Sequence, residues 1–300
     1  MVADQPIIEA INLGKRYGGT EAVRGLNVRV PAGSIYGFLG KNGAGKTTTI
    51  KMLLGMTRPT SGEARVFGLS AALPDASVAI RQRTGFVSEE KELLEYMTVD
   101  EIVRFTAAFY PRWRRDLEQR FRATFGLQGD RKVRALSRGT RTKLALLLAL
   151  CRGADLLLLD EPTAGLDPAM IEEVLQALVA HVSGEGKTVF FSSHQIAEVN
   201  QIADSVAIID RGRAVVSGAL DDLRERYQRI QLVFDGKAPS HTFRAPGVVR
   251  VRSEGRVVTL LSSAGTADLF AEARALAPSS MEASPVTLKE IFLESVEAEN

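Results

Sequence analysis

A glycine-rich segment followed by a lysine and a threonine is the part of the sequence whose residue types most clearly suggest chemistry. Residues 40–47 read Gly-Lys-Asn-Gly-Ala-Gly-Lys-Thr, which matches the phosphate-binding pattern G-x-x-x-x-G-K-[ST]. The glycines let the backbone curl so that successive N–H groups point at an anion, and the helix expected next adds its dipole. Lys46 would neutralise the β- and γ-phosphates of a nucleotide, and the Thr47 hydroxyl can ligate Mg²⁺. A glycine-rich turn without a ligand is the alternative, but the expected strand before the loop and helix after it favour phosphate binding.

Two adjacent acids follow the most apolar run of the chain. Residues 156–161 read Leu-Leu-Leu-Leu-Asp-Glu, and four consecutive leucines are typical of a parallel strand buried on both faces. Asp160 is placed to hold Mg²⁺, directly or through water. Glu161 is the candidate that polarises an attacking water. Alone, the pair could be solvated acids at a strand end, but the phosphate loop on the same chain favours the catalytic interpretation.

The elements that must position these residues are predicted from hydrophobic period and turn signals. In the first third we expect strands at 7–12, 26–30, 34–39 and 62–67, with a helix at 46–54 after the phosphate loop. Residues 78–127 are mainly helical in pattern, with helices expected at 100–110 and 116–125. Another helix is expected at 140–150. Strands at 156–159, 188–192 and 206–209 then alternate with helices at 168–181 and 196–203. This alternation is typical of an α/β domain.

The pattern changes near residue 229. Short strands are expected at 230–235, 248–251 and 257–261, and helices at 267–276 and 288–296. We therefore predict a first domain over 1–228 and a small α+β accessory domain over 229–300.

Composition excludes several classes of protein. The net charge of +2 over 300 residues gives no support for a nucleic-acid binder driven by bulk charge. The single cysteine, Cys151, excludes an internal disulfide, and with three histidines no zinc site is expected; His181 and His241 are predicted on the surface. Neither a secretory signal nor a stretch of about 20 apolar residues is visible, so membrane association is expected to come through a partner.

Five segments within residues 5–225 resemble the motifs of the ABC transporter ATPase family, and along the chain they follow the family order. They are the phosphate loop GKNGAGKTT, the Leu-Ser-Arg-Gly-Thr run at 136–140, LLLLDEPTAGLDP at 156–168, Phe-Ser-Ser-His at 191–194, and GKRYGG around Tyr17. The second is similar to the family signature LSGGQ. The C-terminal VTLKEIFLESV at 286–296 resembles the tail of exporter-type members that carry a short extra domain.

The resemblance implies a P-loop NTPase of the ABC type. Its α/β core would have an N-terminal antiparallel β subdomain, a mainly parallel sheet with helices, and a helical signature subdomain at about 78–150. The small α+β domain would follow.

The resemblance also implies ATP and Mg²⁺ as ligands and assigns residue roles. The implied catalytic residues are Lys46, Glu161 and His194, of which His194 would contact the γ-phosphate. The implied metal ligands are Thr47, Asp160 and Glu89. The implied nucleotide-binding residues are Tyr17, which would stack on adenine, and Gly40, Asn42, Gly43, Ala44, Gly45, Lys46, Thr47, Thr48, Glu89, Ser137, Gly139 and Asp160.

Three positions depart from the family pattern. Glu89 stands where the family usually has glutamine, and Arg138 and Thr140 replace glycine and glutamine of the signature. A carboxylate at position 89 can still orient water or Mg²⁺, but it adds negative charge near the phosphates. Ser137 and Gly139, the two positions that would touch the γ-phosphate, are retained, so hydrolysis is expected.

As the resemblance implies, two copies would face each other head to tail, each ATP lying between the phosphate loop of one and Ser137 and Gly139 of the other. A closing and opening cycle would drive a separate transmembrane permease, with export favoured by the tail. The chain would lie peripherally at the cytoplasmic face of the membrane, without nucleic acid. A soluble ABC ATPase acting on nucleic acid or ribosomes and a catalytically weak partner in a heterodimer are the alternatives. The basic run at 112–115 is either a solvated face or a surface near the membrane partner.

Overall fold

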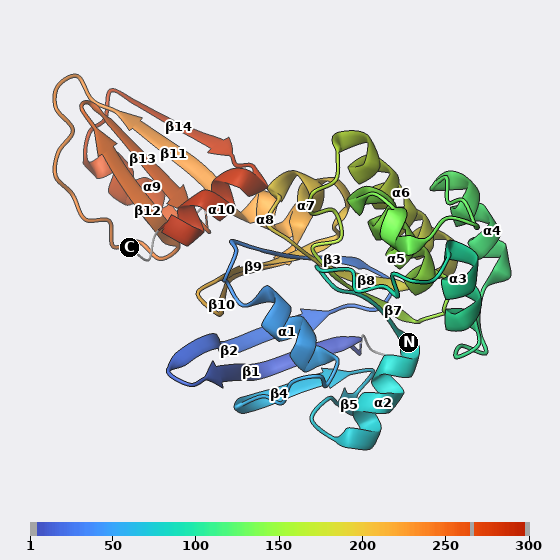
Figure 1. Ribbon diagram of the computed structural model, residues 1–300. Helices are drawn as coiled ribbons and strands as arrows, with labels where there is room; N and C mark the ends of the chain where they lie inside the picture. Colours follow the sequence, from blue (N-terminus) through green and yellow to red (C-terminus); the bar gives the residue numbers. More distant parts are fainter. Residues whose placement is uncertain (1–4, 265–266, 298–300) are drawn as a thin grey trace. The chain divides into compact units, whose positions relative to one another are not determined.

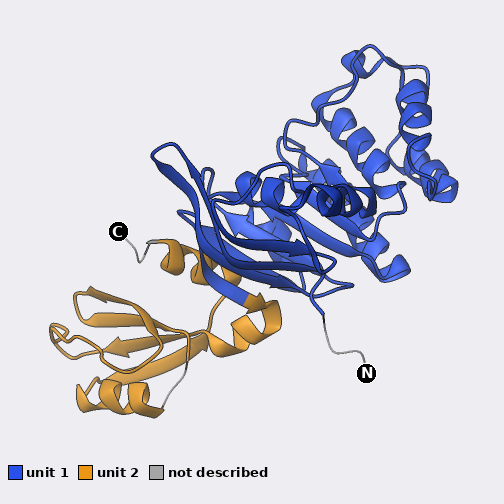
Figure 2. Ribbon diagram, turned by 90° about the horizontal axis from the view of Figure 1, so that it is seen from below, with its two compact units in different colours: residues 1–217 blue, residues 218–300 orange. Residues whose placement is uncertain are grey.

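The computed structural model describes residues 5–264 and 267–297. The chain forms two compact units, residues 1–217 and 218–300 (Figure 2). The division lies some ten residues before the predicted boundary at 228/229, because the helix α8 (Leu220–Arg226) belongs to the second unit. The boundary of the functional domains stays a prediction.

The first unit begins with a sheet in the strand order β2-β1-β4-β5. Its strands are β1 (Ile8–Tyr17), β2 (Thr20–Val30), β4 (Ser61–Val66) and β5 (Leu69–Ser70), and the paired neighbours run antiparallel. β1 and β2 form a hairpin around Gly18-Gly19, which makes both strands longer than predicted. On β2 the alternating Leu26, Val28 and Val30 are buried, as expected for a sheet with one face on the core.

A second sheet in the order β10-β9-β3-β8-β7-β6 forms the centre of this unit (Figure 1). The strands are β3 (Ile35–Gly40), β6 (Thr84–Val87), β7 (Leu156–Asp160), β8 (Thr188–Ser193), β9 (Ser205–Asp210) and β10 (Arg213–Ala219). The five from β9 to β6 are parallel. Every residue of β3, β7 and β8 is buried, which confirms the buried strand predicted from the four leucines.

Helix α1 (Lys46–Leu53) lies between the two sheets (Figure 1). Its residues Ile50 and Leu53 belong to one apolar core together with residues of both sheets, such as Leu26 and Phe190. Opposite α1, helices α5 (Arg138–Leu150), α6 (Pro168–Glu185) and α7 (Ile196–Ile202) cover the other face of the central sheet. The phosphate loop is therefore held by a helix that is packed on both sides.

The predicted mainly helical range contains one sheet strand. Helix α2 (Pro74–Arg83) is followed by β6, and only then come α3 (Val99–Ala107) and α4 (Arg115–Thr124). α3 begins with a reciprocal capping box, in which Thr98 and Glu101 each bond the other's backbone N–H. The pattern predicted 78–127 as mainly helical and did not show the strand at 84–87, because four residues are too few to show a period.

The second unit has its own sheet in the order β12-β13-β11-β14. The strands are β11 (Gln228–Val233), β12 (Val248–Glu254), β13 (Val257–Ser262) and β14 (Ser280–Pro285), and the helices beside α8 are α9 (Ala267–Ala275) and α10 (Leu288–Glu297). Ile230, Leu232, Leu260 and Leu269 form its core. None of the helices in the described residues has the length and apolar character that a membrane span requires.

Candidate active site

The phosphate loop connects the end of β3 to the start of α1, as the motif requires. Gly45 is the N-cap of α1 with φ 104°, and a Cβ there would lie 2.4 Å from the carbonyl oxygen of Ala22. A Cβ on Gly40 would lie 2.6 Å from the carbonyl oxygen of Ile209. Backbone atoms cannot yield to such a contact, so the tight loop that presents its N–H groups depends on glycine at these positions.

Lys46 is buried at the base of this loop, with 6% of the residue exposed. Its Nζ donates to the carbonyl oxygens of Gly40 at 2.7 Å and Lys41 at 3.2 Å. The same Nζ lies 3.0 Å from Oε1 of Glu161, an ion pair between two side chains that are each only 6% exposed. The ammonium group is thus held by acceptors of the protein itself at the place where a phosphate would need it.

The two predicted acids follow β7 and have different environments. Asp160 accepts a hydrogen bond of 2.7 Å from the Ser192 hydroxyl through Oδ1 and is 2% exposed. The Ser192 oxygen in turn accepts from the backbone N–H of Glu161 at 3.0 Å. Glu161 Oε2 lies 2.8 Å from Nδ1 of His194. The structure therefore brings four predicted residues together: Lys46, Asp160, Glu161 and His194.

Glu161 has a backbone conformation that is rare for a residue with a side chain. Its φ is 47°, in the left-handed region. Such conformations persist only where the surroundings hold them, and they cluster at active sites. The glutamate side chain is therefore aimed by an enforced turn at the end of a rigid strand.

The signature residues do not meet the phosphate loop within this chain. Ser137 is the N-cap of α5, and its Oγ accepts from the Thr140 N–H at 3.2 Å and lies 2.9 Å from the Thr140 hydroxyl. Gly139 is buried, and a Cβ there would lie 2.3 Å from Sδ of Met170. In the part of the chain that the structure describes, no hydrogen bond or ion pair links Ser137 or Gly139 to the residues 40–48.

Among the described residues, Tyr17 and Glu89 form no hydrogen bond or ion pair with the other predicted site residues. Tyr17 ends β1, is 48% exposed, and has Nζ of Lys15 4.9 Å from its ring centre. Glu89 follows β6 and is exposed. Both side chains are open to a ligand, and their assigned roles stay predictions.

Two residues of the site escaped the sequence reasoning. Ser192 contacts both acids, through the Asp160 carboxylate and the Glu161 N–H. It lies in the Phe-Ser-Ser-His segment that resembles a family motif, but the sequence analysis assigned it no role. Lys91 is 9% exposed, and its Nζ donates to the Glu161 carbonyl oxygen at 2.8 Å. In the sequence Lys91 is one charged residue within Glu-Glu-Lys-Glu and carries no distinguishing pattern.

His181 corrects an expectation, because it is buried and not on the surface. It is 3% exposed on α6, and neither ring nitrogen has a hydrogen-bond partner among the described residues. Burial lowers its pKa. In the sequence it is the last residue of the helix predicted at 168–181, whereas α6 continues to Glu185 and His181 lies inside it.

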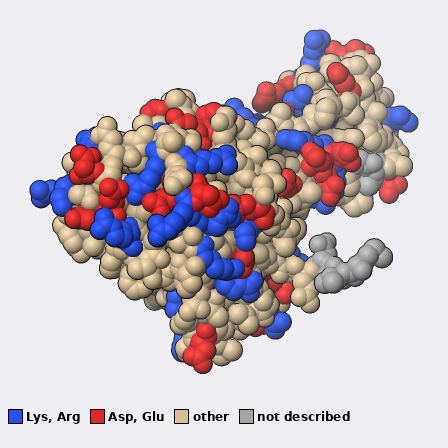
Figure 3. All heavy atoms as spheres, turned by 90° about the vertical axis from the view of Figure 1, so that its right-hand side faces the viewer, with Lys and Arg blue, Asp and Glu red and all other residues tan. Residues whose placement is uncertain are grey.

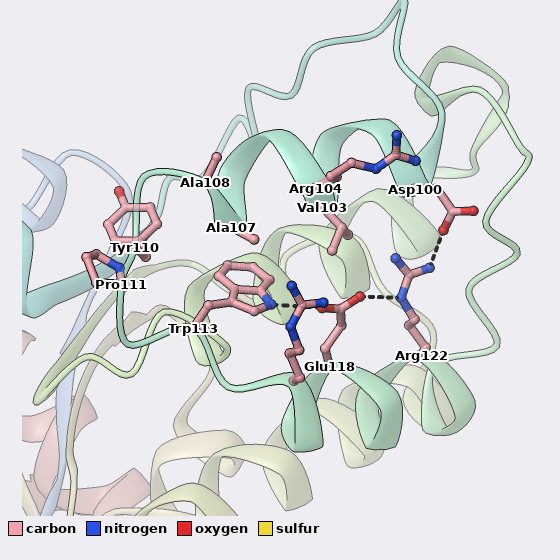
Figure 4. Close-up of a pocket in the computed structure, with 11 residues that line it drawn as sticks. Asp100, Val103, Arg104, Ala107, Ala108, Tyr110, Pro111, Trp113, Glu118 and Arg122 are labelled. Carbon is pink, nitrogen blue, oxygen red and sulfur yellow. Dashed lines mark hydrogen bonds and ion pairs between the residues drawn. The ribbon is translucent and has the colours of Figure 1, made fainter.

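The basic run at 112–115 is largely neutralised by neighbouring acids. Arg112 lies 3.7 Å from Asp155, and Arg114 pairs with Asp116 and Glu185. The Trp113 indole donates to Glu118, in a chain of contacts that bounds a hollow of about 560 Å³ between α3 and α4 (Figure 4). Acidic and basic side chains are likewise interspersed on the face of the molecule shown in Figure 3. A solvated, charge-balanced surface is the interpretation that these contacts favour.

The arrangement can bind an anion and activate water beside it. The loop N–H groups and Lys46 suit phosphate oxygens, Asp160 supplies a buried carboxylate that suits Mg²⁺, and Glu161 can accept a proton. His194 can hold the glutamate in place or donate to a phosphate oxygen. These are the parts from which phosphoryl transfer to water is built.

Comparison with known proteins agrees with this chemistry. The family model described as "ABC transporter" matches residues 23–164. A bacitracin transport ATP-binding protein of Bacillus licheniformis is 36% identical over 237 residues, covering 77% of each chain. A Nod factor export ATP-binding protein of Ralstonia nicotianae is 33% identical, covering 86% of this chain and 82% of the relative. The solved ATP-binding subunit of an ABC transporter has a TM-score of 0.66 at 27% identity, over 73% of this chain and 92% of that one.

Fold, site and relatives define a P-loop ATPase. The chain belongs to the family of ABC transporter ATP-binding proteins. The resemblance predicted from the five motifs is thereby confirmed, as are the α/β core with its antiparallel sheet and the assignment as an ATPase.

Proposed function

We propose that this chain hydrolyses ATP at the site formed by the phosphate loop, β7 and β8. The observation that carries the proposal is a chain of two contacts. Nζ of the buried Lys46 lies 3.0 Å from Oε1 of the buried Glu161, and Oε2 of Glu161 lies 2.8 Å from Nδ1 of His194, whose side chain is 43% exposed. Lys46 and the loop residues Gly40, Asn42, Gly43, Ala44, Gly45, Thr47 and Thr48 hold the phosphates. Glu161 accepts the proton of the attacking water, and His194 orients Glu161 or the γ-phosphate.

Mg²⁺ fits the donors that the chain offers. Asp160 is a buried carboxylate held by Ser192, and the Thr47 hydroxyl and the exposed Glu89 complete a set of oxygen donors of the kind that Mg²⁺ prefers. The metal would neutralise negative charge on the phosphates. Tyr17, half exposed at the end of β1, offers a ring face for adenine.

We also propose that ATP closes a dimer with a second copy of the chain or a related ATPase. Ser137 and Gly139 lie at the N-terminus of α5, which suits an anion, yet they have no contact with the phosphate loop of their own chain in the described residues. A second copy placed head to tail would bring this helix end to the γ-phosphate. Hydrolysis would remove the bridging anion and let the halves separate.

A separate permease would use this cycle, with the chain at the cytoplasmic face of the membrane. A hollow of about 430 Å³ lies where the ends of α1, α2 and α3 meet β6. Met56, Val78 and Phe109 line it and are 52%, 47% and 64% exposed, which is unusual for large apolar side chains that have no partner. We propose that a cytoplasmic segment of the permease covers them. Export is favoured because the matched relatives include a Nod factor export protein.

The test is MgATP hydrolysis by the purified chain as a function of protein concentration, with Lys46→Ala beside it. Specific activity that rises with concentration and is lost in the variant supports two sites completed by dimerisation. Activity retained by a folded Lys46→Ala variant would refute the assignment of the site. ATP binding with negligible hydrolysis at all concentrations would indicate a heterodimer partner or a requirement for the permease.

A further inference from the structure

Lys91 is a buried charged residue beside the proposed site, and the proposed reaction does not use it. It lies four residues after β6, in a backbone with φ 48°, and its N–H donates to the Ser88 carbonyl oxygen at 3.2 Å. Its side chain lines a hollow together with Phe86 and Leu148, so the aliphatic stem has apolar neighbours. Only the ammonium end reaches the catalytic turn, which is the arrangement expected of a lysine with a specific acceptor.

That acceptor is the main chain of the catalytic glutamate. Nζ of Lys91 donates to the Glu161 carbonyl oxygen at 2.8 Å. The same oxygen accepts from the Ala164 N–H at 3.2 Å, the bond that starts the turn toward Gly165-Leu166-Asp167. The N–H of Glu161 is fixed separately, by Ser192. Both peptide groups that flank the left-handed Glu161 are therefore held by side chains, one from β8 and one from the segment after β6.

The charges around Lys91 fit this role. Burial and, to a smaller extent, the positive charge of Arg138 lower its pKa to about 8, whereas Glu89, Asp160 and Glu161 favour its charged form. A desolvated ammonium group gains most from acceptors within reach. Two of the three positions that depart from the family pattern, Glu89 and Arg138, thus act on the same buried lysine.

We propose that Lys91 is a positioning residue for ATP hydrolysis, holding the left-handed turn at Glu161 so that the glutamate carboxylate faces the water. A non-glycine residue at positive φ returns to an ordinary conformation unless its surroundings prevent it. Without Lys91 the Glu161 carbonyl keeps only the Ala164 bond, and the carboxylate samples orientations that do not activate water. Nucleotide binding, which depends on the phosphate loop, is not touched by this change.

Steady-state hydrolysis by the full-length chain tests the proposal through separate values of kcat and KM. Lys91→Met keeps the apolar stem and removes the donor; kcat is expected to fall at least about tenfold, with KM for ATP within about twofold of wild type. Lys91→Arg keeps a charged donor and is expected to recover at least about half of kcat. Lys143→Met is the matched control, because Lys143 is a buried lysine that pairs with Glu173 on α6 and, in the described part of the chain, has no hydrogen bond or ion pair with the Glu161 turn; its kcat should stay within about twofold of wild type.

Several outcomes would overturn the proposal. An unchanged kcat in Lys91→Met, an equal loss in Lys91→Arg, or a rise in KM without loss of kcat would each do so. If Lys91→Met does not fold, Lys91→Gln, whose neutral donor is one bond shorter, must show the same loss of kcat at unchanged KM. The proposal rests on the proposed hydrolytic function, and the two fail differently. If a folded Lys46→Ala variant still hydrolyses ATP, the proposed function is refuted. If Lys46→Ala is inactive but Lys91→Met turns over normally, only the role of Lys91 is refuted.

Discussion

Replacing Glu161 by glutamine is expected to change ATP binding and ATP hydrolysis in opposite directions. In the structure Nζ of Lys46 lies 3.0 Å from Glu161 Oε1, and both side chains are buried. ATP must draw the same ammonium group toward its phosphates, so the carboxylate competes with the ligand. Glutamine has nearly the same shape but no charge, and it therefore removes the competitor along with the proton acceptor.

The size of the effect on binding follows from the distance. At an effective dielectric constant of 20, two unit charges 3.0 Å apart attract by about 5.5 kcal/mol. Desolvation of both groups offsets most of this attraction, and about 1–2 kcal/mol is left as a net contribution, similar to that of a hydrogen bond to a charged group. Releasing it lowers the dissociation constant for ATP by about 5- to 30-fold. Loss of the general base lowers kcat by about 10²- to 10⁴-fold.

Two assays on one protein preparation measure both effects. Isothermal titration with ATP gives the dissociation constant, and release of inorganic phosphate gives kcat. Glu173→Gln is the matched control, because Glu173 also pairs with a buried lysine, Lys143, but away from the phosphate loop; neither quantity should change there. Weaker ATP binding by Glu161→Gln would show that the Lys46 pair does not compete with ATP, and wild-type turnover would show that Glu161 is not the base.

Three further predictions concern buried groups. Ser192→Ala removes the hydroxyl that binds Asp160 and the Glu161 N–H and should lower the free energy of unfolding by about 1–3 kcal/mol in urea titrations; an unchanged midpoint would contradict the role of this hydroxyl. His181 has a pKa that burial lowers below its ordinary 6.5, so the unfolded chain binds the proton first and stability falls as the pH drops below about 6.5. Melting temperatures at pH 7.5 and 5.5 should differ less in His181→Leu than in wild type, and equal differences would refute this cause. Burial raises the pKa of the Cys151 thiol, so a thiol reagent should label it only in denaturant; rapid labelling of the native protein would refute its burial.

The parts of the site that could be predicted from the sequence are those where one residue type is physically required. At Gly45 a side chain would collide with backbone, and at Lys46 the phosphates need a cation, so the pattern leaves few alternatives. The four leucines before Asp160 likewise predicted a strand buried on both faces, which β7 is. At such positions the physical requirement can be recognised from the neighbouring residues in the sequence.

The residues that were not predicted owe their roles to contacts with residues far away along the chain. Lys91 contacts the carbonyl of a residue 70 positions later, and Ser192 contacts an acid 32 positions earlier. Neither contact leaves a period or a spacing in the sequence. β14 was not predicted because Ser280–Pro285 lacks β-branched residues; it is a strand through its pairing with β11.

The departures from the family pattern are better understood together than one by one. Glu89 alone adds negative charge beside a phosphate site, and Arg138 alone adds positive charge at the signature. Both act on Lys91, with Glu89 favouring its charged form and Arg138 opposing it. Arg138 also lies against the turn after Glu161, because a Cβ on Gly165 would lie 2.6 Å from its guanidinium carbon. Arg138 directly and Glu89 through Lys91 therefore bear on the turn that carries the proposed catalytic glutamate, which is why their effect on turnover is expected to depend on Lys91.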